Sequence, residues 1–167
     1  MSADSIVLER TVCSISCPAY RLRLSRDGSV HFQSRNPGEE QRVATDTFDP
    51  AAFGWLLAEA ERIEFYYLPG DVARSKAMCQ TPMPGYPANI TTIYGDATKS
   101  VRNYSGCLYS LNDLWRAKPL ERLREFESSI DSVAGSQRWI RPLGAGCPTA
   151  AETGDERCGV VPSRADP

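Results

Sequence analysis

Two cysteines four residues apart, followed by a proline, form the stretch of this sequence best suited to chemistry. Cys13 and Cys17, with Pro18 directly after them, lie between two segments that alternate as strands do. Two thiols at this spacing can close a small disulfide loop, act as a redox-active dithiol or bind a soft metal such as copper(I). A copper site needs a further ligand, and the single histidine of the chain, His31, is the candidate. These alternatives stay open, with the disulfide preferred.

The cysteine content of the chain predicts its compartment. Six cysteines in 167 residues is an even count and a high one for a cytosolic protein, so we expect disulfides and an oxidising environment. The first five residues lack the basic and apolar regions of a leader. We therefore expect an exported protein (periplasmic, secreted or lipid-anchored) whose leader has been removed; the alternative is a cytosolic protein with free thiols. Local spacing favours the pairs Cys13–Cys17, Cys79–Cys107 and Cys147–Cys158.

Charge and motif content narrow the classes of function. A net charge of −2, from 19 basic and 21 acidic side chains, argues against nucleic acid or an anionic membrane as a partner. No apolar run approaches the roughly 18 residues of a membrane helix. The chain has no Gly-x-Ser-x-Gly elbow, no His-Glu-x-x-His motif and no glycine-rich phosphate loop. We expect a monomeric, non-catalytic protein without a cofactor, with copper as the alternative.

Aromatic side chains with a polar tip provide a second candidate site. Such residues are favoured at recognition surfaces for proteins or sugars. Trp55 lies off the apolar stripe of its predicted helix, while Tyr86 and Tyr109 lie in predicted loops beside a cysteine. The alternative is that half of the aromatic residues fill the core. The expected ligand is a protein or a carbohydrate, bound by Tyr86, Tyr109, Trp115 and Trp55.

Alternating and helical patterns predict the elements that position these residues. Residues 6–12 and 20–25 read as strands, and the Asp27-Gly28 turn joins the second to a returning strand at 30–33. A short strand at 42–47 precedes a helix that begins at Pro50, with Asp49 as its N-cap.

The second half of the chain predicts a further hairpin and a second helix. Residues 89–94 and 98–104 predict a hairpin, and a helix follows from Pro119 to a Gly135 cap. Trp139-Ile140 is expected to add a last extended pairing. Asn89 and Asn103 each begin an Asn-x-Ser/Thr triplet, a glycosylation acceptor only in a eukaryotic secretory route.

Hairpins imply antiparallel neighbours, so the predicted fold is α+β. We expect an antiparallel sheet of four to six strands, including two hairpins, with two helices packed on one face. Residues 1–141 should form a single domain. Residues 142–167 should form a tail that is flexible unless Cys147–Cys158 ties it.

Several spaced motifs agree in order with one known family: Leu8-Glu9-Arg10-Thr11-Val12-Cys13, Cys17-Pro18-Ala19-Tyr20-Arg21-Leu22, Asp27-Gly28-Ser29-Val30, Tyr104-Ser105-Gly106, Ile130-Asp131-Ser132-Val133-Ala134-Gly135 and Trp139-Ile140. Together they resemble a bacterial family of domains of unknown function, found in exported proteins and lipoproteins, with a Cys-x3-Cys-Pro-x-Tyr signature. The resemblance covers roughly residues 6–141 and implies export rather than an activity. Where such proteins read Asp-x-Pro-Thr, this chain has Gly85-Tyr86-Pro87-Ala88.

The cysteine loop also resembles the copper-handling motif of thioredoxin-like assembly factors. In those folds the second cysteine leads into a helix, whereas residues 20–26 here predict a strand.

Overall fold

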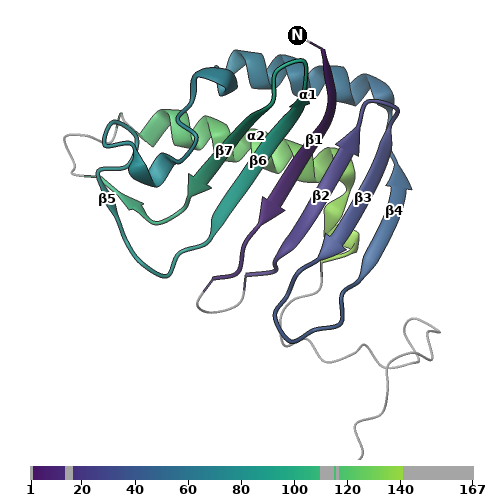
Figure 1. Cartoon of the computed structure of the whole chain (residues 1–167), viewed down its shortest axis with the longest axis horizontal. Helices are drawn as coiled ribbons and strands as arrows, with labels where there is room; N and C mark the ends of the chain where they lie inside the picture. The colour runs from purple at the N-terminus through teal and green to yellow at the C-terminus, as the bar shows by residue number, and fades with distance from the viewer. Residues whose placement is uncertain (1, 14–16, 110–114, 116, 141–167) are drawn as a thin grey trace, which may run out of the picture.

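The computed structural model of this chain describes residues 2–13, 17–109, 115 and 117–140. One antiparallel sheet has the strand order β4-β3-β2-β1-β6-β7 (Figure 1). Its strands are β1 (Ala3–Arg10), β2 (Tyr20–Ser25), β3 (Ser29–Ser34), β4 (Val43–Thr47), β6 (Ala88–Gly95) and β7 (Lys99–Tyr104). Two short strands, β5 (Thr81–Pro82) and β8 (Cys107–Leu108), pair separately.

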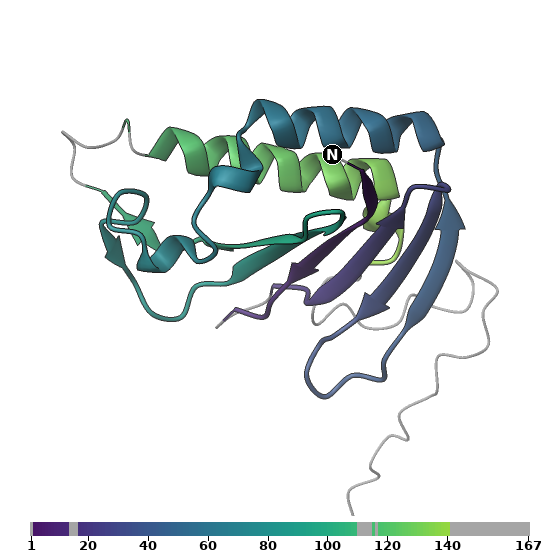
Figure 2. The same cartoon turned by 45° about the horizontal axis from the view of Figure 1, so that its top comes forward.

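Two helices, α1 (Pro50–Arg62) and α2 (Lys118–Ala134), lie across the same face of the sheet (Figure 2). Two three-residue 3-10 helices, η1 (Phe65–Tyr67) and η2 (Val72–Arg74), lie between α1 and β5, and a third, η4 (Ser136–Arg138), follows α2. The predicted α+β class, with four to six antiparallel strands and two helices on one face, is confirmed.

The first predicted hairpin has the expected turn and register. Gly28 has a φ of +87°, and a Cβ there would lie 2.7 Å from the carbonyl oxygen of Phe48, so the turn requires glycine. Leu22 faces Phe32 across the β2–β3 pair, and both are buried.

The boundaries of α1 follow from its capping residues. The Asp49 side chain accepts a hydrogen bond from the backbone nitrogen of Ala51, as predicted for an N-cap. Phe53, Leu56 and Ala60 are buried against the sheet, so one apolar stripe holds this helix in place.

The second hairpin turns both apolar and polar side chains toward the core. Val101 and Ile93 are fully buried as apolar residues should be, yet Asn89, Thr91 and Asn103 are buried on the same side beneath α2. The two asparagines donate hydrogen bonds inside the protein, so neither is an accessible glycosylation acceptor in the folded chain.

The predicted extended pairing at Trp139-Ile140 is wrong. Gly135, with a φ of +61°, ends α2 and turns the chain into η4, where the Trp139 nitrogen donates to the Ser136 carbonyl. The Trp139 ring then packs on Phe32, with ring centroids 5.3 Å apart. The predicted tail at 142–167 and its Cys147–Cys158 pair lie outside the described residues.

Candidate functional site

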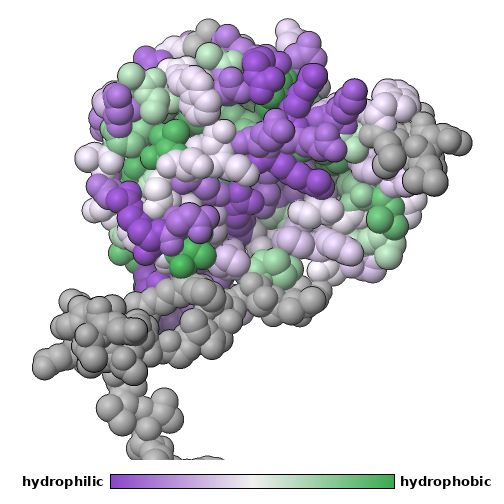
Figure 3. All heavy atoms as spheres, turned by 180° about the vertical axis from the view of Figure 1, so that it is seen from behind, coloured by the Kyte–Doolittle hydropathy of each residue, from purple (hydrophilic) through white to green (hydrophobic). Residues whose placement is uncertain are grey.

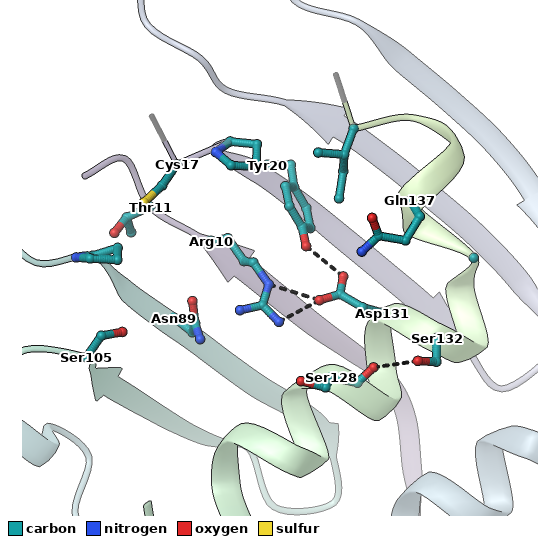
Figure 4. A pocket seen from close by; sticks show the side chains of 14 residues that line it. Arg10, Thr11, Cys17, Tyr20, Asn89, Ser105, Ser128, Asp131, Ser132 and Gln137 are labelled. Atoms are coloured by element: carbon teal, nitrogen blue, oxygen red, sulfur yellow. Dashed lines mark hydrogen bonds and ion pairs between the residues drawn. The ribbon is translucent and has the colours of Figure 1, made fainter. Parts of the chain in front are cut away.

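A cavity of about 640 Å³ opens where three strand ends meet the C-terminal half of α2 (Figure 4). Arg10, the last residue of β1, lies opposite Tyr20 of β2 and opposite Asn89 of β6. This register brings polar side chains that are far apart in sequence to one edge of the sheet. The volume is in the range of ligand pockets. Polar groups come from Arg10, Thr11, Asn89, Ser105, Ser132 and Gln137, among others.

Asp131 of α2 anchors the centre of the cavity. Its Oδ2 accepts hydrogen bonds from Arg10 Nε at 2.9 Å and Nη2 at 2.6 Å. Its Oδ1 accepts from the Tyr20 hydroxyl and the Ser136 hydroxyl, both at 2.8 Å. Figure 4 shows the Arg10 guanidinium between this carboxylate and Asn89. The network therefore joins β1 and β2 to the helix above them.

Burial and charge act together on the ionisable groups of this network. Burial raises the pKa of the Tyr20 phenol, and the Asp131 carboxylate raises it further. Burial lowers the pKa of the Arg10 guanidinium, but the attraction and hydrogen bond of Asp131, together with Tyr20 and Glu127, outweigh this effect, so the net direction is upward. Arg10 and Asp131 consequently form a fixed ion pair.

Glu127 lies one turn before Asp131 on α2 and is 1% exposed. Its Oε2 accepts hydrogen bonds from the side-chain amides of Asn89 at 2.6 Å and Asn103 at 3.0 Å. Within the described part of the chain, Glu127 Oε1, Asn103 Oδ1 and Thr91 Oγ1 have no hydrogen-bond partner. Burial raises the pKa of Glu127 to about 7, although the two asparagines and the positive charges of Arg10 and Arg124 oppose the shift. Asn89 therefore connects this buried carboxyl group to the cavity.

The stability of the wild-type protein should fall as pH rises, because Glu127 loses its proton, and replacing Glu127 with glutamine should abolish this fall. Between the ordinary pKa of 4.5 and the folded value of about 7, the folded protein keeps the proton that the unfolded chain releases. The free energy of unfolding therefore falls as pH rises through this window and is level above it. A glutamine oxygen can accept from both asparagines, while its nitrogen can donate to Asn103 Oδ1.

Urea unfolding of wild type and Glu127→Gln at about pH 5 and about pH 8 measures this effect. We expect the variant to match the wild type at the lower pH and exceed it at the higher pH. Glu125→Gln, at an exposed position on the same helix, is the control and should keep the wild-type slope. A Glu127→Gln variant that loses more stability at the higher pH would contradict the assignment.

Four of the six cysteines are bonded in the described part of the chain. Cys13–Cys17 and Cys79–Cys107 both form disulfides, and Cys17 lines the cavity. The Cys147–Cys158 pair lies outside the described residues. The oxidised loop thus offers no thiolate pair, so the copper alternative applies only to the reduced protein.

His31 lies away from this loop. It is exposed on β3 and pairs with Arg23, three positions along β2 from Tyr20. Within the described ranges, no three His, Cys, Asp or Glu side chains gather in a way that could hold a metal ion.

The predicted aromatic residues are not brought together in the cavity lining. Trp115 is 63% exposed and Tyr86 54% exposed, while Trp55 is 49% exposed on α1. The Tyr86 ring lies against Gly106, next to Ser105 of the cavity. Tyr109 packs against the core and donates to the Met78 carbonyl. From the helix side, hydrophobic residues form small separate patches on a largely hydrophilic surface (Figure 3).

The charged centre of the cavity was not predicted from the sequence. The signal was present in α2, where Glu127 and Asp131 interrupt the apolar stripe one turn apart. An acidic residue at such a position is rarely buried without partners. The partners come from strand ends that only the sheet register brings together, so the sequence spacing could not name them.

A family model described as a domain of unknown function (DUF6438) matches residues 4–133. That range contains the Arg10–Asp131 pair, Glu127 and both bonded cysteine pairs. No curated protein matches the chain. None of the helices in the described ranges is long and apolar enough to cross a membrane.

Proposed function

The chain belongs to the DUF6438 family of domains of unknown function, and we propose that it is an exported, non-catalytic binding domain whose cavity holds a small, neutral, hydroxyl-rich ligand such as a carbohydrate. The observation that carries this proposal is a cavity of ligand size whose charged groups neutralise each other.

Export is supported by the two disulfides of the described residues, because reducing compartments keep thiols unpaired. We place the protein in the periplasm, outside the cell or on a lipid anchor. We take residues 1–141 as a single domain that acts as a monomer.

The charge of the cavity favours a neutral ligand. Arg10 and Asp131 are the charged residues of its lining, and they lie 2.6 Å apart. An anion at the guanidinium would also face Asp131, and a cation at Asp131 would face Arg10, so either would meet repulsion. A hydroxyl or carbonyl group can accept from Arg10 without that cost.

The hydrogen-bonding groups of the wall suit a ligand that both donates and accepts. Ser128 and Ser132 use their hydroxyl protons on carbonyls of α2, so their oxygens remain as acceptors. The Thr11 oxygen accepts from the Ala88 nitrogen, so its proton is available to donate. Sugar hydroxyl groups meet both needs at once.

A peptide is a poorer fit than a sugar. Peptides that bind sheets add a strand to an open edge. At the cavity, β1 is already paired with β2 on one side and with β6 on the other. The wall therefore presents side chains rather than free backbone groups, which favours a compact ligand.

Calorimetric titration with glucose, N-acetylglucosamine, maltose and cellobiose tests the proposal. We expect saturable binding of at least one saccharide. Ser132→Trp, which fills the mouth of the cavity, should weaken it by about tenfold or more. Glu125→Trp places the same side chain at an exposed position of α2 outside the cavity and should leave affinity unchanged.

Acetate, phosphate and trialanine are the comparison ligands. Saturable binding of one of these in place of the saccharides would contradict the proposal. The absence of saccharide binding, or full affinity in Ser132→Trp, would contradict it as well.

A further inference from the structure

The two described disulfides occupy different environments. Cys79 is fully buried in the core, so its bond with Cys107 is shielded on that side. Cys13 and Cys17 are both half-exposed, and Cys17 forms part of the cavity wall. Exchange with an external thiol requires access to a sulfur atom. Access therefore favours reaction at Cys13–Cys17.

A backbone hydrogen bond makes the two sulfurs of this bond unequal. The backbone nitrogen of Cys17 donates to Cys13 Sγ at 3.0 Å. A donor at this position favours the charged form of a thiol, so Cys13 is the better leaving group when the bond opens. An attacking thiolate would then bond to Cys17, the sulfur that the cavity exposes.

We propose that Cys13–Cys17 is a thiol–disulfide exchange site that oxidises a dithiol partner entering through the cavity. A thiolate of the partner attacks Cys17 Sγ, the Cys13–Cys17 bond breaks, and Cys13 leaves as a thiolate. The second thiolate of the partner then attacks its own sulfur in the mixed disulfide and releases Cys17. Two electrons and two protons pass from the partner dithiol to Cys13 and Cys17, and the partner becomes a disulfide.

The surrounding backbone can hold its shape during this reaction. Before the loop, the Thr11 nitrogen donates to the Ala88 carbonyl and the Ala88 nitrogen donates to Thr11 Oγ1. After the loop, the Ala19 nitrogen donates to Asn36 Oδ1, and the Ala19 carbonyl accepts from the Arg35 nitrogen. Both strand ends therefore stay attached to the sheet whether or not the sulfurs are bonded.

Exchange with reduced glutathione on the full-length oxidised chain tests the site. The reaction is stopped at intervals with N-ethylmaleimide, which caps released thiols, and the adducts are mapped by peptide mass spectrometry. We expect Cys13–Cys17 to open about tenfold faster than Cys79–Cys107. The glutathione should be found on Cys17 and the maleimide on Cys13. Equal opening rates, or glutathione mainly on Cys13, would overturn the assignment.

The route through the cavity is tested with dithiothreitol, a dithiol compact enough for a cavity of this size. Ser132→Trp should slow its reaction by about tenfold relative to Glu125→Trp, because only the first substitution fills the cavity mouth. Equal rates in the two variants would overturn entry through the cavity. Saccharide binding is measured separately, so failure of exchange and failure of the proposed binding function are distinguishable.

Discussion

Replacing Asp131 with alanine should destabilise the protein by about 3 kcal/mol, because the substitution leaves several buried donors without an acceptor. The carboxylate is 10% exposed and accepts both Arg10 bonds, while its other oxygen serves the Tyr20 hydroxyl. Removing one partner of a buried ion pair costs more than the pair contributes, since the remaining charge stays desolvated. Urea unfolding near neutral pH measures the loss.

Two further variants separate the causes of this effect. Asp131→Asn keeps the volume but not the charge and should lose nearly as much stability as alanine. Glu59→Ala removes the partner of Arg62 in an exposed pair, where the expected loss is below about 1 kcal/mol. An Asp131→Ala variant that loses no more than Glu59→Ala would show that the network does not join the helix to the sheet.

Removing the Cys79–Cys107 bond should have the second large effect. The residues it joins are 28 positions apart, and closing such a loop restricts the unfolded chain by about 3 to 4 kcal/mol. Cys13 and Cys17 are only 4 positions apart, and the same relation gives about 2 kcal/mol for their bond. Cys79→Ala/Cys107→Ala should therefore be less stable than Cys13→Ala/Cys17→Ala, as measured by urea unfolding without reductant.

The two double variants control for each other, since each removes one bond and leaves no unpaired thiol at the changed positions. The Cys13→Ala/Cys17→Ala protein should also keep the wild-type circular dichroism spectrum, because hydrogen bonds hold both ends of its loop. A larger loss of stability in this variant than in Cys79→Ala/Cys107→Ala would contradict the assignment of Cys79–Cys107 as the stabilising bond and of Cys13–Cys17 as the exchange site.

The elements of the fold were predictable because local rules and global packing agree in them. The glycine turn at Gly28, the Asp49 cap and the apolar stripe of α2 each fix one element from its own residues. The prediction of an extended pairing at Trp139-Ile140 was wrong because two neighbouring apolar residues are equally compatible with the end of a strand and with a 3-10 turn. The observed conformation is set by the Gly135 cap of α2 and by the packing of Trp139 on Phe32, which is a contact between distant parts of the chain.

The candidate site was less predictable than the fold. Cys17 was predicted from its spacing and lies in the cavity wall, but the predicted aromatic residues do not line the cavity, and its polar residues were not predicted. Asn89 and Asn103 read as surface triplets, yet both donate to buried Glu127. Their role depends on the packing of α2 over β6 and β7, which no local sequence pattern specifies.

Locating the bound ligand on the protein is the measurement that most directly tests the central claim, which is that the cavity is the binding site. We would titrate isotope-labelled protein with the tightest-binding saccharide and follow the side-chain amide signals of Asn89 and Gln137 together with the indole signals of Trp55 and Trp115. The account predicts saturable shifts of the two amides, because both residues line the cavity, with the indoles unchanged. Shifts confined to the indoles would place the ligand on the exposed aromatic surface and contradict the account.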